Sequence, residues 1–295
     1  MSALWAHLLA PGLLANAPVV QALWLGAMVA VASAVVGVLV VVRGQAFLGH
    51  ALGDMGVTGG AGALLAGVGA LWGFLAAGLA AGSAVELGGG EGERARDVTT
   101  GVVLSAAVGL AALFLYLVTT LSSDAGATQT ILFGSIFTAS PATLPLVAAL
   151  SAVALGLVAL VGRPLLFATV APEAARARSV PVRQVGYLFL LAVVLAVEQS
   201  ALVVGALLST ALLIGPAAAA VQVSRTVAGA LAAGVAIALA VVALGIVLAY
   251  DSYTWPPANV GWPASFFVTS LTLVAYLAAR AIGRPRRREG GAEAA

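Results

Sequence analysis

The hydrophobic pattern of this chain consists of long apolar runs, separated by short breaks that contain glycine, proline or arginine. An α-helix needs roughly 20 apolar residues to cross a bilayer. Runs of about this length predict spans at 19–42, 55–81, 98–120, 143–161, 185–198, 201–221, 227–249 and 263–282. We therefore expect an all-α polytopic membrane protein with about eight transmembrane helices.

The fifth and sixth expected spans are short, because 185–221 is long for one crossing and brief for two. If they form a hairpin, twelve of the thirteen arginines fall on one side of the membrane and only Arg43 lies opposite. The positive-inside rule then places that side, with both termini, in the cytoplasm. We expect the hairpin to break near Glu198, Gln199 and Ser200, where irregular backbone must be buried in protein or line a wet cavity.

Composition supports this class and excludes several chemistries. The chain is 62% hydrophobic and 8% charged, with a mean hydropathy of +1.12, whereas soluble domains carry roughly 25% charged residues. It has no cysteine, which excludes disulfides, thiolate metal ligation and a cysteine nucleophile. It also has no lysine, so a Walker-type phosphate loop is absent, and any ATP must be hydrolysed by another subunit.

The most informative polar pair is His50 and Asp54, which stand at i and i+4 and so share one face if the stretch is helical. Burying an imidazole and a carboxylate in an apolar segment is costly unless they are paired, hydrated or metal-bound. The pair is interpreted as a two-ligand metal site or as a structural carboxylate–histidine contact. The spacing alone leaves both interpretations open.

Glycines recur four residues apart in the expected second span, which allows a neighbouring helix to approach its backbone closely. The pairs are Gly56 and Gly60, Gly69 and Gly73, and Gly78 and Gly82. We expect this span to be central.

Four stretches of the sequence carry a family resemblance. Residues 43–54 are similar to an arginine followed by Phe-x-Gly-Asp-Ala-Leu-Ser-His, and residues 96–101 to Glu/Asp-Asp-x-x-x-Gly. Residues 131–136 are similar to Leu-Phe-Gly-Asp-Ile-Leu, and residues 204–220 to Val-Gly-x-Leu-Leu-x-x-Ala-Leu-Leu-Ile-x-Pro-Ala-x-x-Ala. Together they resemble the ABC-3 integral membrane permeases of bacterial importers for zinc, manganese and related divalent metals. The resemblance runs over about residues 19–282.

Two departures bear on the site. The family usually has aspartate and then histidine four residues later, whereas His50 precedes Asp54 here, so the donor set is kept in reversed order. The family pair contacts metal in the translocation path, and the resemblance implies this role for His50 and Asp54. Ser135 stands where the family has a further aspartate.

An imidazole with a carboxylate suits zinc, manganese or ferrous iron better than calcium or magnesium. Further carboxylates that would complete the metal shell in some state are Asp124, Asp251 and Glu198. Their alternative roles are solvation in outer loops for the two aspartates and capping of the helix break for Glu198.

Two loops are candidate docking surfaces. The loop 163–183 contains a short helix-forming basic stretch with Pro172, Glu173, Arg176 and Arg178. By resemblance it is expected to couple to an ATPase, although positive-inside topology alone would explain its charge. The aromatic and proline-rich loop 250–263 is expected outside, as a partner surface or an interfacial anchor.

The resemblance implies a permease subunit and not an enzyme. The expected domains are an N-terminal interfacial segment (1–18), a transmembrane permease domain (19–282) and a basic, disordered cytoplasmic tail (283–295). The expected cargo is zinc or manganese, or else iron, with no permanently bound cofactor. Expected partners are a cytoplasmic ABC ATPase, an extracytoplasmic metal-binding protein, a second copy of the chain and membrane lipid, with no nucleic acid, in the bacterial inner or plasma membrane.

Two other function classes were weighed. A proton-coupled secondary metal transporter would need no ATPase, but carriers usually bury more carboxylates at mid-membrane and often contain repeated halves. An intramembrane metallopeptidase would use His50 and Asp54 as catalytic ligands, but the sequence has no His-Glu-x-x-His motif and too few histidines.

Overall fold

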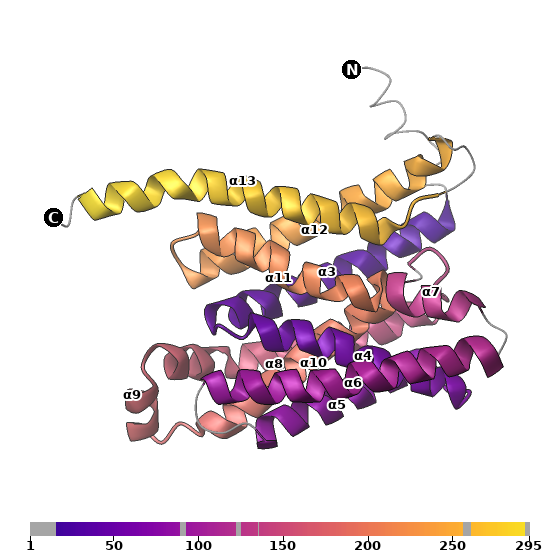
Figure 1. Cartoon of the computed structure of the whole chain (residues 1–295). Coiled ribbons are helices and arrows are strands. Elements are labelled where there is room, and N and C mark those ends of the chain that lie inside the picture. Colours follow the sequence, from indigo (N-terminus) through magenta and orange to yellow (C-terminus); the bar gives the residue numbers. More distant parts are fainter. Residues whose placement is uncertain (1–15, 89–92, 122–124, 135, 256–260, 293–295) are drawn as a thin grey trace, which may run out of the picture.

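The computed structural model describes residues 16–88, 93–121, 125–134, 136–255 and 261–292, and these are helical apart from short turns. The helices pack side by side as one bundle (Figure 1). Their bounds are α3 (Ala17–Val42), α4 (Ala46–Leu65), α5 (Ala70–Gly88), α6 (Glu93–Leu121), α7 (Ala125–Phe133), α8 (Thr143–Val170), α9 (Pro172–Ala177), α10 (Val182–Val204), α11 (Ala206–Val223), α12 (Val227–Asp251), the 3-10 turn η1 (Ser252–Thr254) and α13 (Ala264–Ala292).

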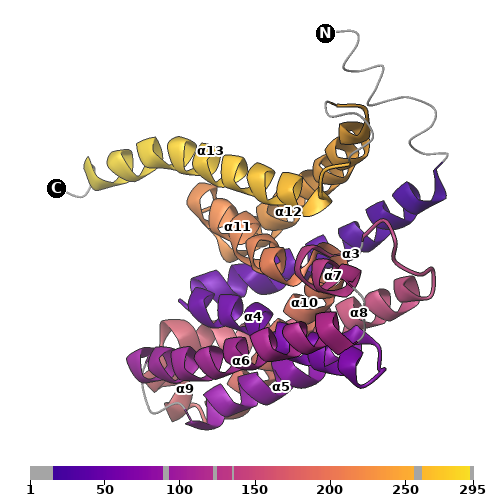
Figure 2. The ribbon, with the colours of Figure 1, turned by 45° about the vertical axis from the view of Figure 1, so that its right-hand side comes forward.

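Seven helices in the described ranges are long and apolar enough to cross a membrane, and α11 is a shorter apolar helix. This confirms the prediction of an all-α polytopic membrane protein. Figure 2 shows α12 and α13 on one side of the bundle and α5 and α6 on the other. α3 is central, and 67% of its most apolar 18-residue stretch is buried. Small side chains along α3 let neighbouring helices approach it closely.

The predicted single span at 55–81 is wrong, because this segment forms the antiparallel helices α4 and α5. A turn at 66–69 separates them, and Gly67 has a φ of +70°, a left-handed conformation that glycine adopts without strain. The two backbones lie against each other: a Cβ at Gly59 would overlap the carbonyl oxygen of Gly73, and the reverse holds for Gly73. The glycine spacing predicted a close helix approach in this segment, but to a separate helix and not between its own two halves through Gly59.

The split into α4 and α5 moves Arg43 to the same end of the bundle as the other arginines. Its guanidinium donates a hydrogen bond to Thr169 at the end of α8. Two residues, Val170 and Ala171, separate Thr169 from Pro172, where α9 begins. The prediction that Arg43 lies opposite the other arginines is therefore wrong. By the positive-inside rule, the end that carries α9 faces the cytoplasm.

The order of the helices also changes the expected placement of the chain ends. In Figure 1, α3 begins at the end of the bundle opposite α9, whereas α13 runs toward the α9 end. Within the described chain, the C-terminal end lies on the cytoplasmic side and the start of α3 lies on the opposite side. The prediction had placed both termini on the cytoplasmic side. The backbone of α13 stays helical to Ala292, beyond its membrane-spanning part, which ends at Gly283.

The hairpin of the fifth and sixth spans is present as α10 and α11, but it breaks at a different residue. Glu198, Gln199 and Ser200 lie inside the continuous helix α10. The break is at Gly205, which has φ +104° and ψ +148° and is buried. Irregular backbone at this depth is enclosed by protein, as the absence of water in a bilayer requires.

Candidate functional site

The candidate metal pair lies on α4. His50 Nε2 is 3.8 Å from Asp54 Oδ2, and the side chains are 51% and 27% exposed. This separation exceeds a hydrogen bond, so the two groups do not bind each other tightly. Both project from one outward face of the helix, as their spacing predicted. The geometry leaves a nitrogen and an oxygen donor beside the same open space.

An adjoining face of α4 is packed closely against neighbouring helices. Gly49, Gly53, Gly56 and Gly60 recur along it at helical spacing, and all are buried. A Cβ at Gly53 would lie 2.9 Å from Ser209 Oγ of α11, and one at Gly60 would lie 2.8 Å from the Phe74 ring of α5. These contacts fix the rotation of α4 and thereby hold His50 and Asp54 on the outward face.

Glu198 is fully buried in α10, at 0% exposure, and neither carboxylate oxygen has a hydrogen-bond partner among the described residues. The carboxylate fills the space beside Gly56 of α4 and Gly78 of α5. Gly56 is about 200° around the helix from Asp54, so Glu198 packs against the face turned away from the metal pair. The predicted role of Glu198 as a cap of the helix break is wrong, and its carboxylate does not reach the pair.

This environment favours an uncharged side chain at position 198, since an ionised carboxylate without a partner is costly in an apolar interior. We expect Glu198→Gln to keep the stability of the protein within about 1 kcal/mol, because the amide has the same shape. Glu198→Ala should lower stability by about 2 kcal/mol or more through the cavity it leaves. Detergent-solubilised thermal unfolding measures both. A Gln variant less stable than the Ala variant would contradict this account.

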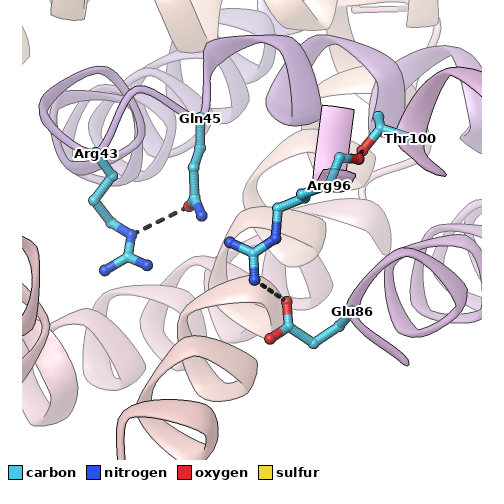
Figure 3. A network of polar contacts seen from close by, with 5 residues as sticks. All are labelled: Arg43, Gln45, Glu86, Arg96 and Thr100. Carbon is cyan, nitrogen blue, oxygen red and sulfur yellow. Dashed lines mark hydrogen bonds and ion pairs between the residues drawn. The ribbon is translucent and has the colours of Figure 1, made fainter. Parts of the chain in front are cut away.

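Two sets of polar contacts lie near each other at the cytoplasmic end, one in each of the first two family-like stretches (Figure 3). Arg43 Nε donates to Gln45 Oε1 at 3.2 Å, and Arg96 Nη2 donates to Glu86 Oε2 at 2.8 Å. Thr100 Oγ1 donates to the carbonyl oxygen of Arg96 at 2.8 Å. Burial lowers the pKa of the Arg43 guanidinium, as does the Arg96 charge, whereas Glu86 raises it. α4 and α6 pack against each other, and these contacts lie at their cytoplasmic starts.

The other two family-like stretches also meet. Gly134, just after α7, has φ +83°, and a Cβ there would overlap the backbone of Val204. In return, a Cβ at Gly205 would overlap the backbone of Phe133. The α7 end therefore packs backbone to backbone against the break between α10 and α11. The sequence analysis did not predict this contact, because it depends on residues about 70 positions apart.

Of the remaining predicted carboxylate ligands, the described one, Asp251, does not join the pair. Asp251 ends α12, at the end of the bundle opposite the arginines, and its Oδ2 accepts a hydrogen bond from Trp255 Nε1 at 3.2 Å. Asp124 and Ser135 lie outside the described residues. Within the described chain, no group of three or more histidine, aspartate or glutamate side chains is placed to hold a metal ion.

The predicted coupling stretch forms a short helix of its own. α9 covers Pro172–Ala177, and its Pro172 and Glu173 are exposed, as is Arg178 just beyond it. Ala175 is fully buried and fixes the helix to the bundle. The side chain of Arg176 is outside the described part. α9 thus presents an exposed surface at the cytoplasmic end.

An aromatic cluster occupies the opposite end. Trp255, Trp262, Phe266 and Phe267 contact one another edge-to-face or stacked, with ring centroids 5.3–6.2 Å apart. This cluster lies beside a cavity of about 920 Å³ lined from α7, α12 and the start of α13. The placement agrees with the predicted outer position of this segment, and its role as interfacial anchor or partner surface stays a prediction.

Comparison with known proteins identifies a family match over most of the chain. A model of the ABC 3 transport family matches residues 16–277. The manganese transport system membrane protein MntC of Halalkalibacterium halodurans is 28% identical over 200 residues, which are 68% of this chain and 68% of that protein.

Two solved structures have the same fold. PsaBC from Streptococcus pneumoniae, solved in complex with Fab, has a TM-score of 0.77 and 22% identity over 95% of each chain. An inward-facing ABC transporter has a TM-score of 0.68 and 14% identity over 88% of this chain and 84% of that one. At these identities the likeness concerns the fold alone.

Proposed function

This chain belongs to the ABC 3 transport family, and we propose that it is the membrane permease of an ATP-driven importer of divalent transition metal ions. The proposal depends chiefly on the His50–Asp54 pair, a nitrogen and an oxygen ligand on one outward face of α4. This donor set suits manganese, zinc and ferrous iron. The likeness to MntC, whose name states manganese transport, favours manganese among them.

ATP hydrolysis belongs to a separate cytoplasmic subunit in this proposal. The chain has no lysine and therefore no Walker-type phosphate loop. α9 and the residue just beyond it, with the predicted coupling residues Pro172, Glu173, Arg176 and Arg178, are proposed to dock on that ATPase. An extracytoplasmic metal-binding protein is proposed to dock at the opposite end, near the aromatic cluster of α12 and α13.

A second copy of the chain completes the proposed metal path. Two ligands alone bind a metal weakly, and the described chain offers no third to the pair. Two copies related by a two-fold axis would bring together two imidazoles and two carboxylates around one metal ion. Alternatively, they would leave some coordination positions of the ion for water. A transit site must release its ion, so incomplete coordination in any single state is appropriate.

The proposed cycle uses these parts in order. The binding protein delivers the ion at the outer end, the His50–Asp54 pairs receive it, and closure of the ATPases changes which end is open. The chain itself is assigned no covalent chemistry. A proton-coupled secondary transporter is the alternative, in which the chain would move metal without an ATPase.

The test uses metal-starved cells that depend on this chain. We expect deletion to lower total cellular manganese, zinc or iron selectively, and we expect the tagged chain to copurify with an ATPase subunit. Mass-spectrometric metal analysis and identification of the copurified proteins are the two measurements. Unchanged metal content after deletion would refute metal import, whereas import that continues without any ATPase would support the secondary transporter.

A further inference from the structure

Arg43 connects four helices at the cytoplasmic end, and the proposed cycle gives it no task. It follows α3, and its Nη1 donates to Thr169 Oγ1 of α8 at 3.0 Å while its Nε donates to Gln45 at 3.2 Å. Its guanidinium carbon lies 5.6 Å from the centre of the Phe189 ring of α10. One side chain therefore contacts the N-cap residue of α4, the last turn of α8 and the first half of α10.

The contact with α8 is made next to the predicted ATPase-docking helix. Thr169 is in the last turn of α8, and its hydroxyl also donates to the Leu165 carbonyl at 2.8 Å. Only Val170 and Ala171 separate it from Pro172, the first residue of α9. A displacement of α9 therefore acts on Thr169 with almost no intervening chain to absorb it.

The contact with α4 is made next to the metal pair. Gln45 is the N-cap residue, immediately before α4, and His50 follows within the next two turns. Five residues of helix correspond to roughly 7.5 Å, over which an α-helix moves as a rigid element. A shift of Gln45 is thus carried directly to His50 and Asp54.

The partners of Arg43 suit a contact that is made and broken. In the described chain the ion pairs formed are His50–Asp54 and Arg96–Glu86, so Arg43 is held by neutral oxygens and a ring instead of by a carboxylate. Hydrogen bonds to neutral groups are directional but weaker than a fully paired salt bridge in a low-dielectric site. Small movements of α8 can therefore redirect the guanidinium.

We propose that Arg43 is the positioning residue that transmits movement of α9, through Thr169 and Gln45, to the His50–Asp54 pair. The inference rests on the proposed function and adds to it the route by which ATPase movement changes the metal pair. Arg43 itself binds neither metal nor ATPase.

The test is the coupling ratio of the assembled transporter, with its ATPase, in lipid vesicles. We expect Arg43→Met to lower metal ions moved per ATP hydrolysed by about five-fold or more, while metal-independent ATP hydrolysis stays within about two-fold. Thr169→Val should lower the same ratio in the same direction, and the double variant should be no worse than Arg43→Met. Arg43→Lys should restore part of the ratio, because lysine keeps one donor and the charge.

Arg225→Met is the matched control, since Arg225 is an exposed arginine at the same end, in the turn between α11 and α12. Its coupling ratio should equal that of the unchanged transporter. A fall of transport and hydrolysis in equal proportion for Arg43→Met, or an unchanged ratio for Thr169→Val, would overturn the proposal.

A labelled helix gives a second readout. Because the chain has no cysteine, Phe47→Cys, at a position 42% exposed on α4, accepts a single spin label. ATP should change the mobility of the label when Arg43 is present, and should not change it in the Arg43→Met variant. An equal change of label mobility in both proteins would refute transmission through Arg43. If the unchanged transporter moves no metal, the proposed function fails, whereas a coupled transporter that is insensitive to Arg43 and Thr169 removes only this inference.

Discussion

Replacing His50 and Asp54 together by alanine is expected to lower metal uptake by about ten-fold or more at matched membrane abundance, with the fold retained. The pair supplies the two donor atoms that α4 would offer to the proposed metal path, at 3.8 Å from each other. Loss of even an indirect contact to a metal ligand costs roughly ten-fold or more in affinity. Both side chains project outward, so their truncation leaves the glycine-lined packing face of α4 unchanged.

The matched control exchanges the two side chains, as His50→Asp with Asp54→His. This variant has the same composition and restores the order found in related permeases. We expect it to retain uptake within about three-fold, because the two donors remain one helical turn apart on the same face. Radiolabelled manganese and zinc uptake measures both variants. Equal uptake by the alanine variant and the unchanged chain would reduce the pair to a structural contact.

The second large effect is expected at Gly205. Its φ of +104° is a conformation that side chains with a Cβ adopt only under strain, which costs about 1–3 kcal/mol. A Cβ there would also overlap the backbone of Phe133, which cannot turn aside as a side chain could. We therefore expect Gly205→Ala to destabilise the protein by about 3 kcal/mol or more.

Gly109→Ala is the control for this prediction, because Gly109 lies within α6 with open space at its Cβ position. Alanine there should keep or slightly raise stability, by up to about 1 kcal/mol, through its better helix propensity. Thermal unfolding followed by tryptophan fluorescence compares the two variants. If Gly205→Ala unfolds at the same temperature as Gly109→Ala, the buried break is not the strained contact described.

The helices could be predicted because each corresponds to a local run of apolar residues. The breaks between helices depend instead on backbone conformation. The turn between α4 and α5 consists of Ala66, Gly67, Val68 and Gly69, which carry no polar side chain to interrupt the hydropathy. Only the positive φ of Gly67 marks it. Merging the two helices reversed the expected side of Arg43.

The polar residues of α10 misled the prediction for the opposite reason. Glu198 and Gln199 are typical of a loop by composition, yet the space for them is provided by distant residues. Gly56 and Gly78 accommodate the carboxylate, and Ser151 Oγ donates to Gln199 Oε1 at 3.0 Å. Contacts between segments this far apart in sequence cannot be read from a local pattern.

The candidate metal pair was predictable because i,i+4 spacing on a helix is a local property. The helix that contains it is confirmed, and its donors lie on one face. The role of the pair as a metal site remains a prediction. The route from α8 to α4 through Arg43 was not predictable, since Arg43 and Thr169 are 126 residues apart.

The most direct test of the account is metal accumulation by sealed vesicles that contain the chain assembled with its ATPase. We predict saturable accumulation of manganese, zinc or ferrous iron that requires ATP hydrolysis and disappears with His50→Ala plus Asp54→Ala. Accumulation that is driven by a proton gradient in vesicles without the ATPase, or ATP-driven accumulation that the double variant leaves intact, would contradict it.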